Sequence, residues 1–416
     1  MNIVSDTINY VFLFIALYIE VFFLITYFEF TERESKETSP KSNIGRKLKL
    51  PSVSIIVPVW NEETTVLKTI FSILKLNYPK DKLSILIVDD GSTDNTWKVI
   101  QKFAKNKQVT LLQKENEGSK FAALNYALNR VNTDLVGCLD ADSFVHPEAL
   151  SRIVAQFENP EIMAVTPSIK IFEPKGFLGL IQKAEYIFGV FLRKVFYYLN
   201  ALYITPGPFS IFRKSVFEKL GGYKHAHHTE DMEMAMRMQR NGMKIGNVHN
   251  AFVYTIAPTN FKTLYKQRLR WVYGFLKNTI DYRDMLFKPQ YGNLSMIVLP
   301  AAGLSVISTL YFLGAMIMSW INILITKIQE ISAIGIQFQS FSFDLFYVNT
   351  DIVIFLSLIA FFGTLFIIIT SRKLAEEKHK FGWDSILFMM FYTLIAPIWM
   401  IKAVYNVLFV KETTWR

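Results

Sequence analysis

One stretch decides the fold, Leu83-Ser84-Ile85-Leu86-Ile87-Val88-Asp89-Asp90-Gly91-Ser92. Its first six residues are a short, mostly apolar run, which predicts a buried strand. An acidic pair and a glycine follow at once, and they predict a turn at the carboxyl end of that strand. A helix is expected from Thr96 to Lys105, so the stretch indicates a strand that leads through a short loop into a helix.

The same order of strand and helix recurs on both sides of this stretch. Further strands are predicted at 53–58, 109–113 and 135–139, and further helices at 62–76 and from about Ser119. Strands that alternate with helices predict an α/β domain with a mostly parallel, Rossmann-like sheet and helices on both faces. In such sheets ligands bind at the carboxyl ends of the strands.

The composition indicates that part of the surface faces lipid. The chain has 416 residues, of which 51% are hydrophobic and only 19% charged, whereas soluble proteins carry about a quarter charged residues. The formal net charge of +10 would suit nucleic acid, anionic lipid or an anionic substrate. Nucleic acid is disfavoured, because many basic residues cluster beside apolar segments instead of forming a stripe with aromatics. The single cysteine, Cys138, excludes an intrachain disulfide.

Four apolar regions are long enough to cross a bilayer, which takes about 20 residues. They cover about 8–28, 294–325, 345–369 and 386–409. No small-residue cleavage site follows the first region, so we interpret it as an anchor. Glu20 interrupts this anchor, and two interpretations stay open: a functional carboxylate in the membrane, or a neutral acid that packs by a hydrogen bond against another helix.

Basic residues between these regions predict the topology. They follow the first region (Arg33, Lys36, Lys41, Arg46, Lys47, Lys49) and also lie between the third and the fourth (Arg372, Lys373, Lys378, Lys380). The positive-inside bias places both segments in the cytosol and the basic-poor segment 327–344 outside. We therefore expect a multi-pass protein of the cell membrane with a cytosolic α/β domain. Four crossings would put Trp415 and Arg416 on the far side, but Pro397 leaves open a break into a short span and an interfacial helix.

Two further segments mix aromatic, apolar and charged residues, at about 177–202 and 262–287. The first carries Lys183, Glu185, Arg193 and Lys194, which suits a helix in the membrane interface better than a spanning helix. The predicted domains are thus an N-terminal transmembrane anchor (1–30), a basic cytosolic linker (31–50), an α/β domain with these interface helices (51–290) and a C-terminal transmembrane region (291–416).

Two acidic loops follow predicted strands. Asp89-Asp90-Gly91-Ser92 suits hydrogen bonds to a base or ribose, although a simple strand-to-helix turn would have the same sequence. Asp140-Ala141-Asp142 places two carboxylates where both can approach a hard divalent cation that bridges to a diphosphate. Asp-x-Asp alone is a weak motif, and its position after a buried strand is what strengthens it.

Two later motifs each have a functional and a structural interpretation. In Thr229-Glu230-Asp231 one carboxylate can serve as general base for a hydroxyl, while Thr229 can cap the helix that follows. Gln267-Arg268-Leu269-Arg270-Trp271 offers two guanidinium groups for diphosphate oxygens and a flat indole for a sugar or base. A juxtamembrane basic and aromatic anchor would look the same.

Taken together, the motifs resemble those of the processive family 2 glycosyltransferases, which include cellulose, hyaluronan, chitin and bacterial poly-β-1,6-N-acetylglucosamine synthases. The resemblance covers about 52–274 and also includes Val57-Pro58-Val59-Trp60-Asn61-Glu62 and Gly118-Ser119-Lys120. It implies a GT-A domain that sits on amphipathic interface helices over a membrane channel.

The resemblance also implies roles for individual residues. The nucleotide sugar would contact Pro58, Glu62, Asp89, Asp90, Lys120, Asp140 and Ala141. Asp142 would ligate Mg²⁺ or Mn²⁺, Asp231 would be the catalytic base, and Glu230 would support it. The diphosphate and the acceptor end of the glycan would contact Gln267, Arg268, Arg270 and Trp271.

The function that the resemblance implies is inverting transfer of a sugar from a UDP-sugar donor, which extends and translocates a β-linked polysaccharide. UDP-N-acetylglucosamine is the first guess for the donor. Its partners would be the donor, the growing glycan, the bilayer and possible accessory export subunits, but no nucleic acid. The alternative is transfer of one sugar to a lipid carrier, although such relatives commonly lack the Gln-x-x-Arg-Trp element. A degenerate, non-enzymatic scaffold is disfavoured because the carboxylates are present.

The chain departs from the family pattern at Pro206-Gly207-Pro208-Phe209-Ser210, where many relatives have a Gly/Ser-rich acceptor loop. The family assigns no ligand role to His225, His227 and His228, so a polar loop is expected there.

Overall fold

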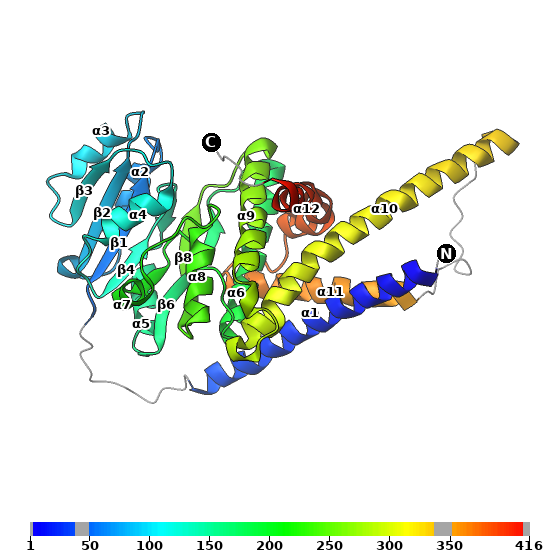
Figure 1. Ribbon diagram of the computed structural model, residues 1–416, viewed down its shortest axis with the longest axis horizontal. Helices are drawn as coiled ribbons and strands as arrows, with labels where there is room; N and C mark the ends of the chain where they lie inside the picture. The colour runs from blue at the N-terminus through cyan, green and yellow to red at the C-terminus, as the bar shows by residue number, and fades with distance from the viewer. Residues whose placement is uncertain (1–2, 38–49, 337–351, 411–416) are drawn as a thin grey trace.

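An eight-stranded sheet forms the centre of the α/β domain in the computed structural model (Figure 1), which describes residues 3–37, 50–336 and 352–410. Its parallel half contains β1 (Val53–Val59), β2 (Leu83–Asp90), β3 (Val109–Lys114) and β4 (Leu135–Cys138). β1 lies between β2 and β4, and β2 also pairs with β3, all in parallel. The four strands expected from the sequence are therefore confirmed.

The second half of the sheet is mixed. It contains β5 (Ser143–Val145), β6 (Ile162–Ile171), β7 (Ile211–Arg213) and β8 (Lys244–Thr255). β7 is antiparallel to both β4 and β6, β6 and β8 are parallel, and β5 is antiparallel to β8. The full order is β3-β2-β1-β4-β7-β6-β8-β5. The sequence did not single out these four strands, of which β5 and β7 are only three residues long.

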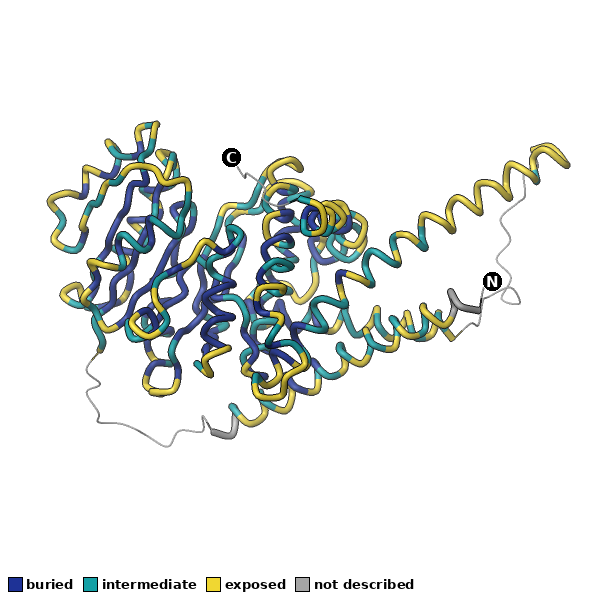
Figure 2. The backbone as a smooth tube through the Cα atoms, viewed as in Figure 1, coloured by how far each residue is buried: buried dark blue, intermediate teal, exposed yellow. Residues whose placement is uncertain are grey.

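Helices cover both faces of the sheet. They are α2 (Val66–Leu74), α3 (Thr96–Ile100), α4 (Lys120–Leu128), α5 (Ala149–Gln156), α7 (Lys214–Leu220) and α8 (Glu230–Arg240). Ile55 and Val57 belong to one buried cluster and Ile56 to another on the opposite face. Strands buried on both faces read as continuous apolar runs, as β1 and β2 do, and Figure 2 shows the strands as the most deeply buried part of the domain.

Two longer helices connect the domain to the apolar helices, and both match the predicted interface segments. α6 (Gly176–Tyr198) packs against β6 and β8 and also against the apolar helices α1 (Ile3–Glu37), α11 (Ile352–Leu374) and α12 (Trp383–Phe409). α9 (Phe261–Asp281) packs mainly against α12. Phe177 and Phe391, from α6 and α12, meet with ring centroids 5.0 Å apart.

Within the described residues, four helices are long and apolar enough to cross a membrane, namely 7–34 within α1, 294–334, α11 and α12. The second comprises a π-helical turn (Leu294–Val298) and α10 (Leu299–Ile334). Pro397 lies inside α12, which runs on to Phe409, so the last apolar region is one helix in the described structure. The linker residues 38–49, residues 337–344 of the predicted external segment, and Trp415 and Arg416 lie outside the described residues.

Glu20 packs against α11. The hydroxyl of Thr364 donates a hydrogen bond to Glu20 Oε1 at 3.1 Å, and a β-carbon on Gly363 would stand 2.8 Å from the Glu20 carboxyl carbon. A larger residue at position 363 would therefore require the end of the Glu20 side chain to shift. This contact favours the interpretation of Glu20 as a helix-packing acid.

The basic segment between α11 and α12 lies against the α/β domain. Arg372 Nη1 donates to Asp384 Oδ2 at 2.6 Å, while Glu377 accepts from Lys170 of β6 and Lys183 of α6 at 2.7 and 2.8 Å. This segment and the α/β domain therefore lie at the same end of the apolar helices, as the predicted topology requires.

Candidate active site

A cavity of about 1210 Å³ opens at the carboxyl ends of the parallel strands and continues to α6, α9 and α12. It is lined by all but two of the residues to which the resemblance assigns a role in binding or catalysis: Pro58, Glu62, Asp90, Lys120, Asp140, Ala141, Asp142, Glu230, Asp231, Gln267, Arg270 and Trp271. The two that do not line it are Asp89 and Arg268. The motifs are thus gathered from across the chain into one place.

The two aspartates after β2 have different surroundings. Asp89 is fully buried and accepts hydrogen bonds from Ser92 N and Gln113 Nε2, both at 3.2 Å, so it holds the loop together. Asp90 lines the cavity and accepts from Lys114 Nζ at 2.9 Å. Gly91 has a φ of +67°, and a β-carbon there would stand 2.8 Å from Asn116 N, so this turn requires glycine.

Glu62 lines the cavity on the β1 side. Burial raises the pKa of Glu62 above its ordinary value. Its carboxylate accepts a hydrogen bond from the Thr65 hydroxyl, and its main-chain N–H donates to Thr96 Oγ1 at 2.8 Å. The hydrogen bond between Glu62 and Thr96 connects the loops after β1 and β2. A nucleoside that contacts both loops would have to bind between them.

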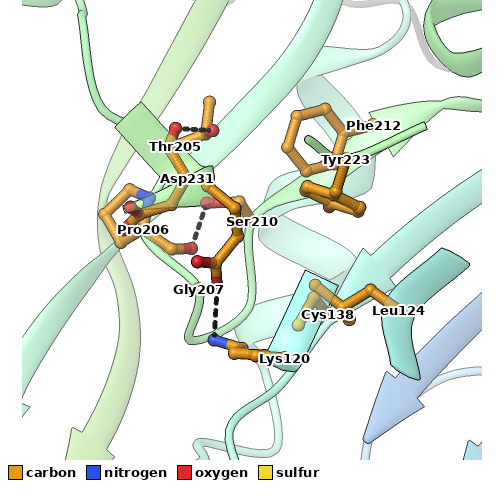
Figure 3. A pocket seen from close by; sticks show the side chains of 11 residues that line it. Lys120, Leu124, Cys138, Thr205, Pro206, Gly207, Ser210, Phe212, Tyr223 and Asp231 are labelled. Carbon is orange, nitrogen blue, oxygen red and sulfur yellow. Dashed lines mark hydrogen bonds and ion pairs between the residues drawn. The ribbon is translucent and has the colours of Figure 1, made fainter. Parts of the chain in front are cut away.

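Lys120 connects the Asp140 loop with α8. Its Nζ atom lies 2.5 Å from Asp140 Oδ1 and 3.4 Å from Glu230 Oε1. Burial lowers the pKa of Lys120, but Asp140 and Glu230 outweigh this and raise it well above the ordinary value. A β-carbon on Gly207 would stand 2.7 Å from Lys120 Nζ, so the Pro-Gly-Pro loop lies directly on this ion pair. Figure 3 shows Lys120, Gly207 and Asp231 around one small pocket.

The carboxylates of Asp140 and Asp142 are crowded together. Burial, and then the charge of Asp140, raise the pKa of Asp142 to about 6. Ser143 Oγ donates to Asp142 Oδ1 at 3.0 Å, and Thr69 Oγ1 donates to Ala141 O at 2.7 Å, which fixes the loop. Two carboxylates that destabilise each other suit a hard divalent cation. Within 3–37, 50–336 and 352–410 no cluster of three or more His, Cys, Asp or Glu side chains could hold a metal, so the donor's diphosphate would have to complete the coordination.

Asp231 lies in the first turn of α8. Its carboxylate accepts from Met232 N at 2.9 Å, and its main-chain oxygen accepts from Thr205 Oγ1 at 2.8 Å. Burial, and then the adjacent Glu230, raise the pKa of Asp231 to about 6. Thr229 stands at the N-cap position without a side-chain cap; its hydroxyl instead donates to Ala226 O at 3.0 Å. A buried carboxyl group with a pKa near neutrality is suited to accept a proton.

The residues of the Gln-Arg-Leu-Arg-Trp motif lie on different faces of α9. Gln267, Arg270 and Trp271 line the cavity, whereas Arg268 is only 2% exposed. Arg268 donates from Nε to Glu185 Oε1 at 3.1 Å and from Nη2 to Glu185 Oε2 at 2.6 Å. Its Nη1 atom donates to Gln267 Oε1 at 2.6 Å, and the guanidinium carbon lies 4.2 Å from the Trp271 ring centroid.

The structure therefore does not place Arg268 in the lining of the cavity, where we expected it from the sequence. Its guanidinium is engaged by protein groups, and the Tyr392 hydroxyl of α12 donates to the same Glu185 at 2.9 Å. The arrangement joins α9, α6 and α12, and it orients Gln267 and Trp271. A direct contact between Arg268 and a diphosphate stays a prediction from the resemblance; the geometry favours a positioning role.

Gly274 sets the distance between α9 and the Thr229-Glu230-Asp231 motif. A β-carbon on Gly274 would stand 2.3 Å from Thr229 Oγ1. We expect Gly274→Ala to displace Thr229 at a cost of about 1–3 kcal/mol, to lower the unfolding temperature and to reduce turnover at least about tenfold. Gly303→Ala is the matched control, because nothing lies within 4 Å of its β-carbon position. Equal unfolding temperatures and rates for the two variants would contradict this close packing.

Several cavity residues were not assigned to the site from the sequence. Tyr186 and Arg193 of α6, Phe388 and Tyr392 of α12, and the histidine loop all line it. The sequence around these residues contains no recognisable catalytic or binding motif, and only the fold brings the residues together. His227 Nε2 lies 2.9 Å from Asp281 Oδ2, and burial, then His225, lower the pKa of His228. The loop is thus a polar wall of the cavity.

The fold and the site define a glycosyltransferase of the GT-A type. A solved mannosyltransferase, PcManGT from Pyrobaculum calidifontis in complex with GDP-Man and Mn²⁺, has a similar fold, with a TM-score of 0.59 and 18% identity; the match covers 96% of this chain and 100% of that one. Residues 54–221 match the model of glycosyl transferase family 2, which supports a family 2 glycosyltransferase domain in this part of the chain.

Curated relatives agree with this assignment over most of the chain. The poly-beta-1,6-N-acetyl-D-glucosamine synthase of Staphylococcus epidermidis is 28% identical over 354 residues, which is 84% of this chain and 81% of the relative. The synthase of the same name from Staphylococcus aureus strain COL is 29% identical over 269 residues, 63% of this chain and 64% of the relative. The chain is thus homologous to these synthases.

Proposed function

We propose that this protein is an inverting, metal-dependent glycosyltransferase that uses UDP-N-acetylglucosamine to extend a β-linked polysaccharide. One observation carries the proposal: Asp90, Asp142, Asp231 and Arg270, from four separate segments, line a single cavity that continues to the apolar helix α12. Homology to poly-β-1,6-N-acetyl-D-glucosamine synthases over 84% of the chain supports the choice of donor and product.

The strand-end loops would hold the donor. Glu62 and Asp90 face the cavity from the loops after β1 and β2, where they can accept hydrogen bonds from the nucleoside. Asp142, with Asp140 beside it, would hold Mg²⁺ or Mn²⁺. When bound, the metal ion supplies positive charge that stabilises the diphosphate as it leaves. Lys120 keeps Asp140 in place through their ion pair.

Asp231 would act on the acceptor. Its carboxylate takes the proton of the acceptor hydroxyl while that oxygen attacks the anomeric carbon from the side opposite the diphosphate. A bond forms between this oxygen and the anomeric carbon, and the bond from that carbon to the diphosphate oxygen breaks. An α-linked donor thereby gives a β-linked product. Arg270 would bind the departing diphosphate, and Trp271 would support a sugar ring.

The membrane arrangement is part of the proposal. Four candidate spans flank the domain, and we place the domain in the cytosol, where UDP-sugars would reach the cavity. The product would then leave past α6 and α12 and cross the membrane, with or without accessory export subunits.

The test is a donor screen on the purified full-length protein. Release of the nucleoside diphosphate would be measured as UDP from UDP-N-acetylglucosamine and UDP-glucose and as GDP from GDP-mannose, with Mn²⁺, Mg²⁺ or EDTA present. Labelled product would then be extracted with organic solvent and digested with linkage-specific hydrolases. We expect UDP-N-acetylglucosamine to give metal-dependent polymer that stays in the aqueous phase. Product that moves entirely into the organic phase as a single-sugar lipid would support transfer to a lipid carrier instead.

The raised pKa of Asp231 predicts the pH dependence of transfer. Because its pKa is about 6, the protonated form persists to higher pH than for an ordinary aspartate, and this form cannot accept a proton. We expect kcat/KM to be constant above about pH 7 and to fall about tenfold per pH unit below about 6, more steeply if Asp142 is protonated as well. UDP release in overlapping buffers measures this profile. A flat profile from about pH 5 to 7 would exclude a base of this kind.

A further inference from the structure

One charged side chain of α6, Arg193, forms no ion pair with the part of the chain that the structure describes. The other three charges form ion pairs, Lys183 with Glu377, Glu185 with Arg268, and Lys194 with Glu34. The Nε and Nη2 atoms of Arg193 are shielded from solvent, and no described residue accepts a hydrogen bond from either. Arg193 as a whole is partly buried, but two shielded N–H groups without acceptors are costly, and a ligand that is not part of the protein could satisfy them.

Arg193 lines the cavity that holds the proposed catalytic carboxylates, together with Tyr186 and Gly189 of the same helix. Tyr186 interacts electrostatically with both Asp142 and Arg193, so Arg193 lies close to the proposed donor site without being one of its predicted residues. Burial lowers the pKa of Arg193 to about 10, which leaves the guanidinium charged at neutral pH.

The two atoms without partners form the edge of the guanidinium that can bind two oxygens at once. Arg268 uses the same edge, Nε and Nη2, to hold both carboxylate oxygens of Glu185 at 3.1 and 2.6 Å. Paired, parallel hydrogen bonds of this kind match the geometry of a carboxylate or a phosphate. Arg193 thus presents an oxyanion-binding edge whose oxyanion is missing from the described residues.

The surroundings of Arg193 place this edge beside the apolar helices. Its neighbours Phe188 and Leu192 also line the cavity, and the adjacent Phe191 packs on Tyr27 of α1 with ring centroids 5.2 Å apart. The guanidinium lies over Gly189, with Nη1 3.5 Å from the position of a β-carbon. Because Nε and Nη2 are shielded, binding of an anion would require the outer torsions of Arg193 to turn this edge toward the cavity.

We propose that Arg193 forms an acceptor subsite that binds a phosphate or carboxylate group carried by the acceptor. The proposal rests on the glycosyl transfer proposed above and specifies the charge of the acceptor. The donor diphosphate has Arg270 and the Asp142 loop for its own binding, so a separate cation on the α6 side serves a second anion. A lipid-linked acceptor would supply a phosphate, and an acidic sugar would supply a carboxylate.

Equilibrium binding on the full-length protein in nanodiscs tests the proposal without turnover. The probes are farnesyl phosphate, for the lipid phosphate, and glucuronate, for the acidic sugar. Wild type, Arg193→Met, Arg193→Lys and the exposed control Arg130→Met would be compared. We expect one probe to bind to wild type and to the control, with affinity reduced at least about tenfold in Arg193→Met and less in Arg193→Lys, which keeps the charge but loses the paired edge.

Whether farnesyl phosphate or glucuronate binds shows whether the anionic group of the acceptor is a lipid phosphate or the carboxylate of an acidic sugar. Absence of binding by either probe to wild type, or equal binding to wild type and Arg193→Met, would overturn the subsite. Steady-state kinetics add a second readout: the KM of the acceptor should rise at least about tenfold in Arg193→Met while the donor KM changes less than about twofold. A parallel rise in the donor KM would assign Arg193 to the donor and contradict the proposal. If wild type transfers no sugar, the proposed function fails, yet probe binding still decides the role of Arg193.

Discussion

Asp231→Asn is expected to lower the rate of sugar transfer by about 10²- to 10⁴-fold, which is the usual contribution of a general base. The amide has nearly the shape of the carboxyl group but cannot accept the proton of the attacking hydroxyl. The side chain would keep its hydrogen bond from Met232 N, so the fold and donor binding should be retained. The measurement is initial UDP release at saturating donor, together with the KM of the donor.

Two further variants make the Asp231 result specific. Asp81→Asn removes an exposed carboxylate far from the lining of the cavity and should leave the rate unchanged. Glu230→Gln should cost less than Asp231→Asn, because Glu230 acts through its ion pair with Lys120 at 3.4 Å. A full rate for Asp231→Asn, or a greater loss for Glu230→Gln, would remove Asp231 from the role of base.

Asp142→Asn is expected to raise the activation free energy by about 3–4 kcal/mol because the metal binds more weakly. This increase lowers the rate by about 10²- to 10³-fold. Asn retains one oxygen that can ligate, so raising Mn²⁺ should restore part of the activity. Burial, and then the charge of Asp140, raise the pKa of Asp142 to about 6, so its ionised form is unfavourable in the apo fold, and Asn removes this ionisation. The apo protein should therefore unfold at an equal or higher temperature than wild type while losing activity.

A titration of activity against free Mn²⁺ measures the Asp142 effect. The concentration of Mn²⁺ for half-maximal rate should rise at least about tenfold in Asp142→Asn and stay unchanged in Asp81→Asn. Wild-type activity that survives EDTA, or equal Mn²⁺ dependence in both variants, would argue against a metal at this loop.

The parallel half of the sheet and its acidic loops could be predicted because each rests on local sequence. Apolar runs such as Val53–Val59 are buried on both faces, and an aspartate loop at the end of a parallel strand lies at the edge where ligands bind. β5 and β7 could not be predicted this way, since three residues carry too little pattern. They depend on pairing with β8 and β4, far away in sequence.

Arg268 shows how a motif can mislead when its secondary structure is neglected. Positions 267, 270 and 271 are three and four residues apart and so share one helix face, whereas position 268 is turned about 100° away. This spacing could have indicated that Arg268 leaves the cavity. Its partner Glu185 could not have been identified, because the pair joins two helices that are 83 residues apart in sequence. The unpaired state of Arg193 likewise emerges only from the packing.

The most direct test of the account is a structure of the full-length protein with UDP and Mn²⁺. The account predicts nucleotide between the loops after β1 and β2, a Mn²⁺ anomalous signal within coordination distance of the Asp142 carboxylate and the diphosphate, and Asp231 on the acceptor side of the cavity, opposite the diphosphate. Nucleotide bound elsewhere, or Mn²⁺ held without Asp142, would contradict it.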